Sequence, residues 1–487
     1  MMLAGLILIP LAGGFATWQF GRRSPGAGRG IALAAMLADV ALVAAIALSR
    51  GGETGPWWLT LRAPWIPQLG VQIHLAVDGL SWLLLVLTAG IGVIAVLVSW
   101  REIEDRAGLF YACLLWILGG INGVFISLDL FLFYFCWEVM LVPMYFLIAI
   151  WGHERRAYAA IKFFLFTIAS GLAMLAAIIG LYVLHGQATG SYTFDYLQLL
   201  ETPLSAAAGL WLMVGFLIAF AVKLPVVPLH CWLPDAHSQA PTAGSLILAA
   251  LLLKTGAYGL IRFVLPLFPE AAEAFAPWGM LLGAAGIIYG ASLAFSQTDL
   301  KRLVAYTSVS HMGFVFLGVF AGNELALQGT VMQMICHGIS TGALFIVAGM
   351  LYERLHTRDL SEMGGLWHGM PRLGAAGLLF ALASLGLPGM GNFVSEILIL
   401  FGAFRASPAL TAVAAGGVVL ATIYSLRIVQ RVFFGPRSDR ARQTDLSPRE
   451  AAILAVLAAA ILWLGLFPQP VLRISQPPVR QTIEVVR

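Results

Sequence analysis

The feature that most constrains this chain is the placement of ionisable residues inside long apolar segments. The chain has only four lysines, and two of them, Lys223 and Lys254, interrupt segments that are otherwise apolar. The carboxylates Glu138 and Glu396 are placed in the same way. A charge at the centre of a bilayer costs about 2.5–3.5 kcal/mol on insertion scales. Four such residues indicate a protein that moves ions through a membrane, and protons are the first hypothesis.

The composition points to a helical membrane protein. The 487 residues are 60% hydrophobic and only 11% charged, whereas roughly a quarter of the residues of a soluble domain are charged. The apolar runs have about the 17–25 residues that a membrane-spanning helix needs, and the alternating pattern of a membrane barrel is absent. The net charge of +4 is spread over loops, which argues for orientation in a membrane and against nucleic-acid binding.

These runs predict an all-α, polytopic membrane protein of about 14 transmembrane helices, with no segment long enough for a separate soluble domain. The expected spans lie near residues 3–20, 31–49, 79–100, 109–127, 129–150, 160–184, 207–230, 240–266, 276–295, 302–321, 324–352, 373–405, 409–434 and 450–467.

The distribution of lysine and arginine predicts the orientation. Most of these 28 residues fall in one set of alternate loops if both termini are placed outside, as the positive-inside rule requires. The first run, Leu3–Phe20, precedes Arg22 and Arg23, which is the reverse of a signal peptide. We expect a multi-pass protein of a bacterial inner membrane with both termini in the periplasm.

Two spans are predicted to be discontinuous. Pro225 and Pro228 interrupt the seventh span, and Gly386, Pro388 and Gly389 interrupt the twelfth, because proline removes a backbone donor and clashes with the preceding turn. The two spans cross in opposite directions, and discontinuous helices at matching places of inverted repeats indicate a transport path. Ordinary proline kinks are the alternative.

We therefore expect two inverted five-helix repeats, each with one discontinuous helix. The predicted division is a three-helix segment at 1–108, a first antiporter-like repeat at 109–266, a second repeat at 267–434, and a basic loop with a C-terminal helix at 435–487.

The buried charges suggest a proton relay. Burial disfavours the charged form of an ionisable group, whereas a neighbouring opposite charge favours it, so a lysine and a glutamate that move together or apart act as a switch. We propose Glu138 as the modulating partner of Lys223, Lys254 as the central relay and Glu396 as the last buried site before the outside. A static ion pair that fixes helix packing is the alternative.

Two histidines extend this set. His311 has Thr307 and Ser308 one turn back on its own helix, and His337 has Gln333 at a spacing of four, so each group shares a helix face. Such side chains can pass on protons, directly or through water. Alternatively, they merely form hydrogen bonds to neighbouring helices.

Other polar residues lie at the ends of these spans. Tyr258 and Arg262 follow Lys254 on one face of the eighth span, where Arg262 could simply be an interfacial anchor. His230, Asp235 and His237 follow the seventh span; they could admit protons, but we favour capping of a short turn. Trp57, Trp58 and Trp65 are typical of interfacial aromatics.

Several motifs are absent from the sequence. There is no P-loop or dinucleotide-binding pattern, and the four cysteines have no metal-ligand spacing. We therefore predict no cofactor-binding or metal site in this chain, and any redox centres that drive transport are expected in partner proteins.

Four segments resemble one known family. The matching runs are Val222–Ser245, Leu252–Gly259, Ser308–Gly313 and Phe135–Met144, and they are similar to the antiporter-like membrane subunits of NADH:quinone oxidoreductase (respiratory complex I). The resemblance covers nearly the whole chain. It implies that Glu138, Lys223 and Lys254 form the proton path, and that Glu396, where most members have lysine, marks one branch of the family.

The resemblance also implies a function and partners. The chain would be a proton-translocating subunit that couples electron transfer in partner subunits to pumping, with FMN, iron–sulfur clusters and quinone held by those partners. Neighbouring antiporter-like subunits and the lipid bilayer would contact it. A longer branch ends with extra spans and a lateral amphipathic helix, and we expect neither after Leu466.

Competing interpretations remain at this point. Subunits of Mrp-type cation/proton antiporters and of membrane-bound hydrogenases have similar motifs. A stand-alone solute carrier would work without partners. A scaffold that only positions its neighbours would tolerate neutral residues at Lys223 or Glu138.

Overall fold

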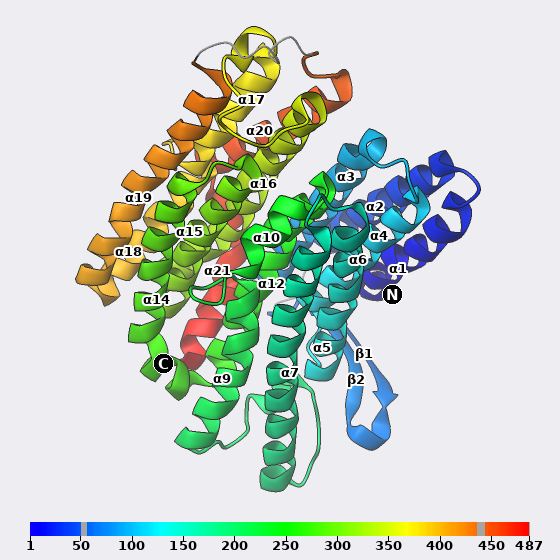
Figure 1. Ribbon diagram of the computed structural model, residues 1–487. Helices are drawn as coiled ribbons and strands as arrows, with labels where there is room; N and C mark the ends of the chain where they lie inside the picture. The colour runs from blue at the N-terminus through cyan, green and yellow to red at the C-terminus, as the bar shows by residue number, and fades with distance from the viewer. Residues whose placement is uncertain (50–55, 436–443, 487) are drawn as a thin grey trace.

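The computed structural model describes residues 1–49, 56–435 and 444–486, which form a broad bundle of long helices with a β-hairpin at one end (Figure 1). In these three ranges, 13 helices are long and apolar enough to cross a membrane. The predicted all-α membrane architecture is confirmed. The difference from 14 arises at the twelfth span, which is divided into two shorter helices.

The uninterrupted spans match the predicted positions closely. They are α1 (Met2–Gly21), α2 (Pro25–Leu48), α3 (Gly79–Glu102), α4 (Ala107–Ile126), α7 (Arg156–Thr189), α14 (Pro269–Ser296), α15 (Leu300–Phe320), α16 (Glu324–Leu355), α19 (Pro408–Ile428), which continues into the π-helical turn η5 (Val429–Phe433), and α20 (Pro448–Leu466). The interrupted seventh span begins with α9 (Ala206–Lys223). Two short helical turns, α8 (Tyr196–Leu199) and η4 (Leu366–His368), lie in connections.

Both predicted breaks are present. Helix α9 ends at Lys223, and the chain becomes helical again only at α10 (Trp232–Gln239). Helix α17 (Pro371–Ser384) is separated from α18 (Gly391–Ala406) by a turn, in which Gly386 and Gly389 take φ values of 76° and 94° that favour glycine. The path from α9 to α10 runs opposite to that from α17 to α18 (Figure 1).

Two further spans are irregular. The fifth is divided into α5 (Leu130–Val139) and α6 (Leu141–Trp151), because Pro143 cannot donate to the carbonyl of Val139.

The eighth span alternates α-helix and π-helix. It consists of α11 (Thr242–Ile247), η2 (Leu248–Leu252), α12 (Leu253–Gly259), η3 (Leu260–Val264) and α13 (Leu265–Leu267), with η2 and η3 π-helical. Turns of π-helix inside α-helices are frequent at functional sites, and Lys254 is the second residue after the first of these turns.

The hairpin between the second and third spans was not predicted. Strands β1 (Leu59–Ile66) and β2 (Val71–Val77) pair antiparallel, with Leu59 opposite Val77, around the 3₁₀ turn η1 (Pro67–Leu69). Trp58 is buried against Trp82, so it is a packing residue, whereas Trp65 is 39% exposed. We call this side of the bundle the hairpin end and the opposite side, where α10 lies, the α10 end (Figure 1).

The expectation that no amphipathic helix follows Leu466 is wrong. Helix α21 (Gln469–Val486) continues through Pro477 and Pro478 and packs against α3 and α16. Val471 and Val479 are buried, whereas Arg473 and Arg480 are exposed. Two adjacent prolines lower the propensity for a helix, and burial of one apolar face against the bundle offsets this cost.

Candidate functional site

The six predicted site residues lie on membrane-spanning helices, and Lys223 is the last residue of α9. Lys254, His337 and His311 are at most 1% exposed, Lys223 is 1% exposed and Glu396 is 3% exposed. Only Glu138 is partly accessible. Charged and polar groups that are buried in a membrane-spanning bundle need partners.

Lys254 and His337 contact each other directly. The Lys254 Nζ atom lies 2.6 Å from Nδ1 of His337 on α16 and 2.5 Å from the Ala249 carbonyl oxygen in η2. The amine and the imidazole nitrogen can each donate to the other, depending on which holds the proton. The pair therefore has the geometry that proton exchange requires.

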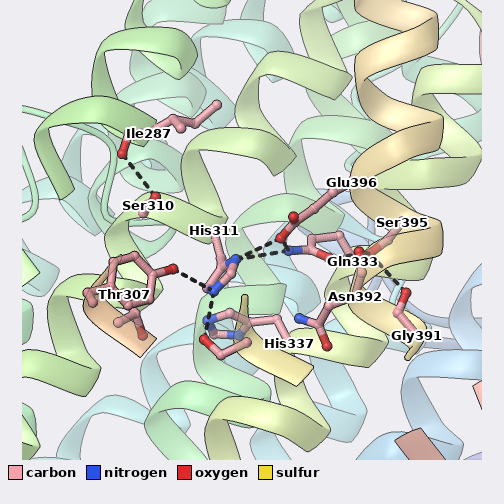
Figure 2. Close-up of polar contacts among 12 residues, drawn as sticks. Ile287, Thr307, Ser310, His311, Gln333, His337, Gly391, Asn392, Ser395 and Glu396 are labelled. Atoms are coloured by element: carbon pink, nitrogen blue, oxygen red, sulfur yellow. Dashed lines mark hydrogen bonds and ion pairs between the residues drawn. The ribbon is translucent and has the colours of Figure 1, made fainter. Parts of the chain in front are cut away.

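His311 and Glu396 form a second contact. The Nδ1 atom of His311 on α15 lies 3.0 Å from Oε1 of Glu396 on α18. Gln333 donates to the same carboxylate oxygen at 3.3 Å, and Ser395 donates to Gln333. Figure 2 shows these side chains converging from α15, α16 and α18. The discontinuous twelfth span thus brings its carboxylate to a histidine of another helix.

The two contacts are joined by the histidine rings. The rings of His311 and His337 are edge to face, with centroids 5.6 Å apart. The result is a continuous row of buried ionisable side chains, which we call the central row: Lys254, His337, His311 and Glu396. All four residues, and the place of Glu396 at the end of the row, were predicted from the sequence, whereas the order of the two histidines depends on how α12, α15, α16 and α18 pack.

Lys223 and Glu138 do not form an ion pair within 4 Å in the described part of the chain. Lys223 Nζ lies 4.8 Å from the centre of the Trp137 ring, a cation–π arrangement, and has no hydrogen-bond partner. Oε1 of Glu138 likewise has none. The alternative of a static, closed ion pair is therefore not what the structure shows. The two groups are neighbours that a small movement could join or separate.

Helix packing holds these two residues in place. Gly171 of α7 faces Glu138, and a Cβ atom there would lie 2.5 Å from Oε1. Gly256 of α12 faces α9, where a Cβ atom would lie 2.7 Å from the Phe220 carbonyl oxygen. Both glycines allow a close approach that alanine would obstruct, and the second places the Lys254 helix directly against the Lys223 helix.

Thr307 and Ser308 lie one turn before His311 on α15, but their hydroxyl groups do not bond to its ring. The hydroxyl groups of Thr307 and Ser308 donate to the Val304 carbonyl of their own helix. The partners of Nε2 are instead Ser384, at 3.2 Å, and Tyr424, at 3.3 Å. These residues come from α17 and α19, and nothing in their sequence surroundings distinguished them.

The expected capping role of Asp235 is also wrong. Asp235 lies within α10 and forms ion pairs with Lys162, at 2.6 Å, and Arg302, at 2.7 Å. Lys301 donates to the Ala240 carbonyl at 2.9 Å. Helix α10 is thus attached to α7 and α15 by charged groups that are far apart in the sequence.

Unpartnered polar atoms lie between α10 and the central row. His237 stacks on Phe345, and both of its ring nitrogens lack hydrogen-bond partners, as do Ser340 Oγ, Thr341 Oγ1 and His337 Nε2. Buried polar groups without protein partners commonly bind internal water. This part of the bundle is therefore suited to hydration.

The described residues contain no group of three or more His, Cys, Asp or Glu side chains that could hold a metal ion. The arrangement instead consists of buried acids and bases within or near hydrogen-bond distance of one another, and such an arrangement is suited to moving protons.

Comparisons with known proteins agree with this geometry. Residues 127–423 match the family described as NADH:quinone oxidoreductase/Mrp antiporter, TM. The chain is 56% identical over 98% of its length to NADH-quinone oxidoreductase subunit M of Pseudomonas aeruginosa, 96% of which is covered. It is 52% identical, over 98% of its length and 97% of the relative, to the Escherichia coli subunit M. A chain of respiratory complex I from Thermus thermophilus matches with a TM-score of 0.91 and 32% identity over 100% of both chains.

Proposed function

The chain belongs to the family of membrane subunits of NADH:quinone oxidoreductase and Mrp antiporters, and we propose that its buried ionisable side chains conduct protons. Its relatives at 52–56% identity are subunit M of NADH-quinone oxidoreductase. The chain is accordingly a proton-translocating membrane subunit of that complex. The assignment of this function to individual residues is the proposal.

The observation that carries the proposal is the central row. A proton on Lys254 can pass to His337 across 2.6 Å, and Glu396 receives it through His311, whose Nδ1 is 3.0 Å from the carboxylate. The transfer between the two histidines requires a water molecule or a ring movement, because their centroids are 5.6 Å apart. A proton that enters an imidazole at one nitrogen and leaves from the other converts the ring to its other tautomer, so each histidine must turn or exchange a proton with water before the next transfer.

Lys223 and Glu138 are proposed to control this row. Because the two side chains are not in contact, approach of Glu138 would stabilise the charged form of Lys223, and withdrawal would release a proton. The helix that carries Lys254 packs directly against α9, which carries Lys223, at Gly256. A movement of α9 would therefore be transmitted to the Lys254 helix.

We propose that protons reach Lys254 from the α10 end. The unpartnered nitrogens of His237 and the hydroxyls of Ser340 and Thr341 lie on α10 and α16 between that end and His337. We place the α10 end in the cytoplasm and the hairpin end, with both termini, in the periplasm. The bias of lysine and arginine toward one set of loops supports this orientation.

The redox chemistry is assigned to partner subunits. FMN and iron–sulfur clusters would carry electrons from NADH to quinone there, while this chain's residues bind, hold and move protons. Neighbouring antiporter-like subunits are the proposed lateral partners. Exposed apolar side chains on several spans, among them Trp278, Phe401 and Val419, suit contact with such subunits or with lipid.

The test is the variant Lys254→Ala in the assembled complex, reconstituted into lipid vesicles. We expect assembly and some NADH:quinone turnover, with fewer protons moved per NADH than in the unchanged complex. Arg405→Gln, at the exposed end of α18, is the control for loss of a positive charge. An unchanged proton-to-electron ratio in Lys254→Ala would contradict the proposed row.

A further inference from the structure

Arg262, Asp78 and Tyr258 lie together at the end of the eighth span that faces the hairpin end. Arg262, in the π-helical turn η3, is 5% exposed, and its guanidinium forms an ion pair with the buried Asp78. The same guanidinium lies 4.9 Å from the centre of the Trp57 ring. Because arginine stays protonated in proteins, this group holds a fixed positive charge between Lys254 and the periplasm.

Tyr258 lies between Lys254 and Arg262 along the eighth span. It lies one turn after Lys254 and one turn before Arg262 on the same helix face. Its hydroxyl donates to the Phe125 carbonyl at 3.0 Å and accepts from Arg262 Nε at 3.3 Å. The Ser81 hydroxyl also lies within hydrogen-bond distance of the Tyr258 hydroxyl, at 3.4 Å, so protein groups surround this hydroxyl and the nearest acceptor for its proton is a backbone oxygen.

The two sides of Lys254 differ in this respect. Toward the α10 end, His237, Ser340 and Thr341 have unpartnered polar atoms. Toward the hairpin end, both Asp78 oxygens are engaged, one by Arg262 and the other by the backbone N–H of Ser81 at 2.9 Å. One side offers places for water, whereas the other combines saturated hydrogen bonds with a fixed charge.

We propose that the Arg262–Asp78–Tyr258 cluster is a proton barrier that stops Lys254 from discharging directly to the periplasm. A fixed arginine charge and occupied hydrogen bonds are devices by which channels exclude protons. The barrier leaves His337 as the outlet of Lys254 and so enforces passage along the central row. This inference rests on the proposed role of Lys254. It assigns to Arg262 the role of setting the direction in which Lys254 releases its proton.

The experiment measures passive proton flux without NADH. Vesicles containing the complete complex are given a membrane potential by potassium diffusion, and internal pH is followed with a trapped dye. We expect Arg262→Gln to raise the flux several-fold, and Arg262→Lys, which keeps the charge, to raise it much less. The surface variant Arg405→Gln should behave as the unchanged complex. Equal leaks in the Gln and Lys variants, or no leak in either, would overturn the barrier.

An unpaired Asp78 could impair assembly of Arg262→Gln, since a buried charge without its partner is strongly destabilising. The double variant Asp78→Asn/Arg262→Gln leaves neither charge and should leak in the same way. If it assembles and remains tight, the proposal is wrong.

A further variant separates this inference from the proposed function. In Lys254→Ala/Arg262→Gln, the leak should fall back toward the unchanged level, because the relay that feeds it is absent. A leak that persists would show that it bypasses Lys254 and would overturn the barrier model alone. Normal pumping in the single variant Lys254→Ala would instead contradict the proposed function.

Discussion

The Nζ atom of Lys254 and the Nδ1 atom of His337 are 2.6 Å apart, although the residues are 83 positions apart in the sequence. This contact joins the eighth span to the eleventh at mid-membrane. Because either atom can hold the shared proton, we propose this contact as the first transfer step of the central row.

Replacing His337 should interrupt the row without removing any lysine. We expect His337→Phe to lower proton pumping on the order of 10²-fold, a loss typical for removal of a positioned proton-transfer group. NADH-driven acidification of reconstituted vesicles measures it. His368→Phe, in the connection before α17, is the matched control, and equal effects of the two changes would argue against a relay at His337.

Glu396 should be needed for its ability to ionise and not for its shape. Glu396→Gln keeps a side chain that can accept from Gln333 and His311, yet it cannot take up a proton. We expect the complex to assemble, as judged by native gel electrophoresis, and the ratio of protons to electrons to fall. Glu324→Gln changes a carboxylate that pairs with Arg480 outside the row and should leave the ratio intact. A normal ratio in Glu396→Gln would exclude Glu396 as a proton site.

Gly171 should set the position of Glu138. A Cβ atom at Gly171 would lie 2.5 Å from Oε1 of Glu138, so Gly171→Ala must displace the carboxylate from its place near Lys223. A misplacement of about 1 Å can cost a reaction on the order of 10²-fold, and we expect a pumping loss up to that size. Gly209→Ala, on α9 with nothing within 4 Å, should pump normally. If both variants pump alike, the Glu138 position does not control transport.

The loop between α6 and α7 should lose stability in acid. Burial, together with the positive charges of Lys301 and Arg358, lowers the pKa of His153 from 6.5 to about 3. The unfolded loop therefore binds more protons than the folded one between these values, so stability is complete above pH 6.5 and declines as the pH falls toward 3. Hydrogen exchange of residues 152–155 should accelerate from pH 7 to pH 5, after correction for intrinsic rates. His153→Phe, which retains a ring against Tyr352, should remove this dependence; an unchanged dependence would assign it to another group.

Several features of this protein could be predicted from local sequence. The apolar runs fixed the number and places of the spans, because a helix needs a definite length to cross hydrocarbon. Pro225 and Pro388 located both broken helices, because the loss of a backbone donor acts within one turn. The hairpin and α21 were missed, since the hairpin is short and the proline pair of α21 resembles a helix end. The division into repeats remains a prediction.

The buried charges were visible in the sequence because a charge inside an apolar run is costly wherever it lies in the fold. Lys223, Lys254, Glu138 and Glu396 were therefore identified one by one. Their partners were not, because a hydrogen bond depends on which helix faces meet in space. Ser384 and Tyr424 reach His311 from α17 and α19, and Asp78 reaches Arg262 from the start of α3. The sequence by itself determined which buried groups are candidates for proton transfer, and the packing of helices distant in the chain decided which of these groups lie next to one another.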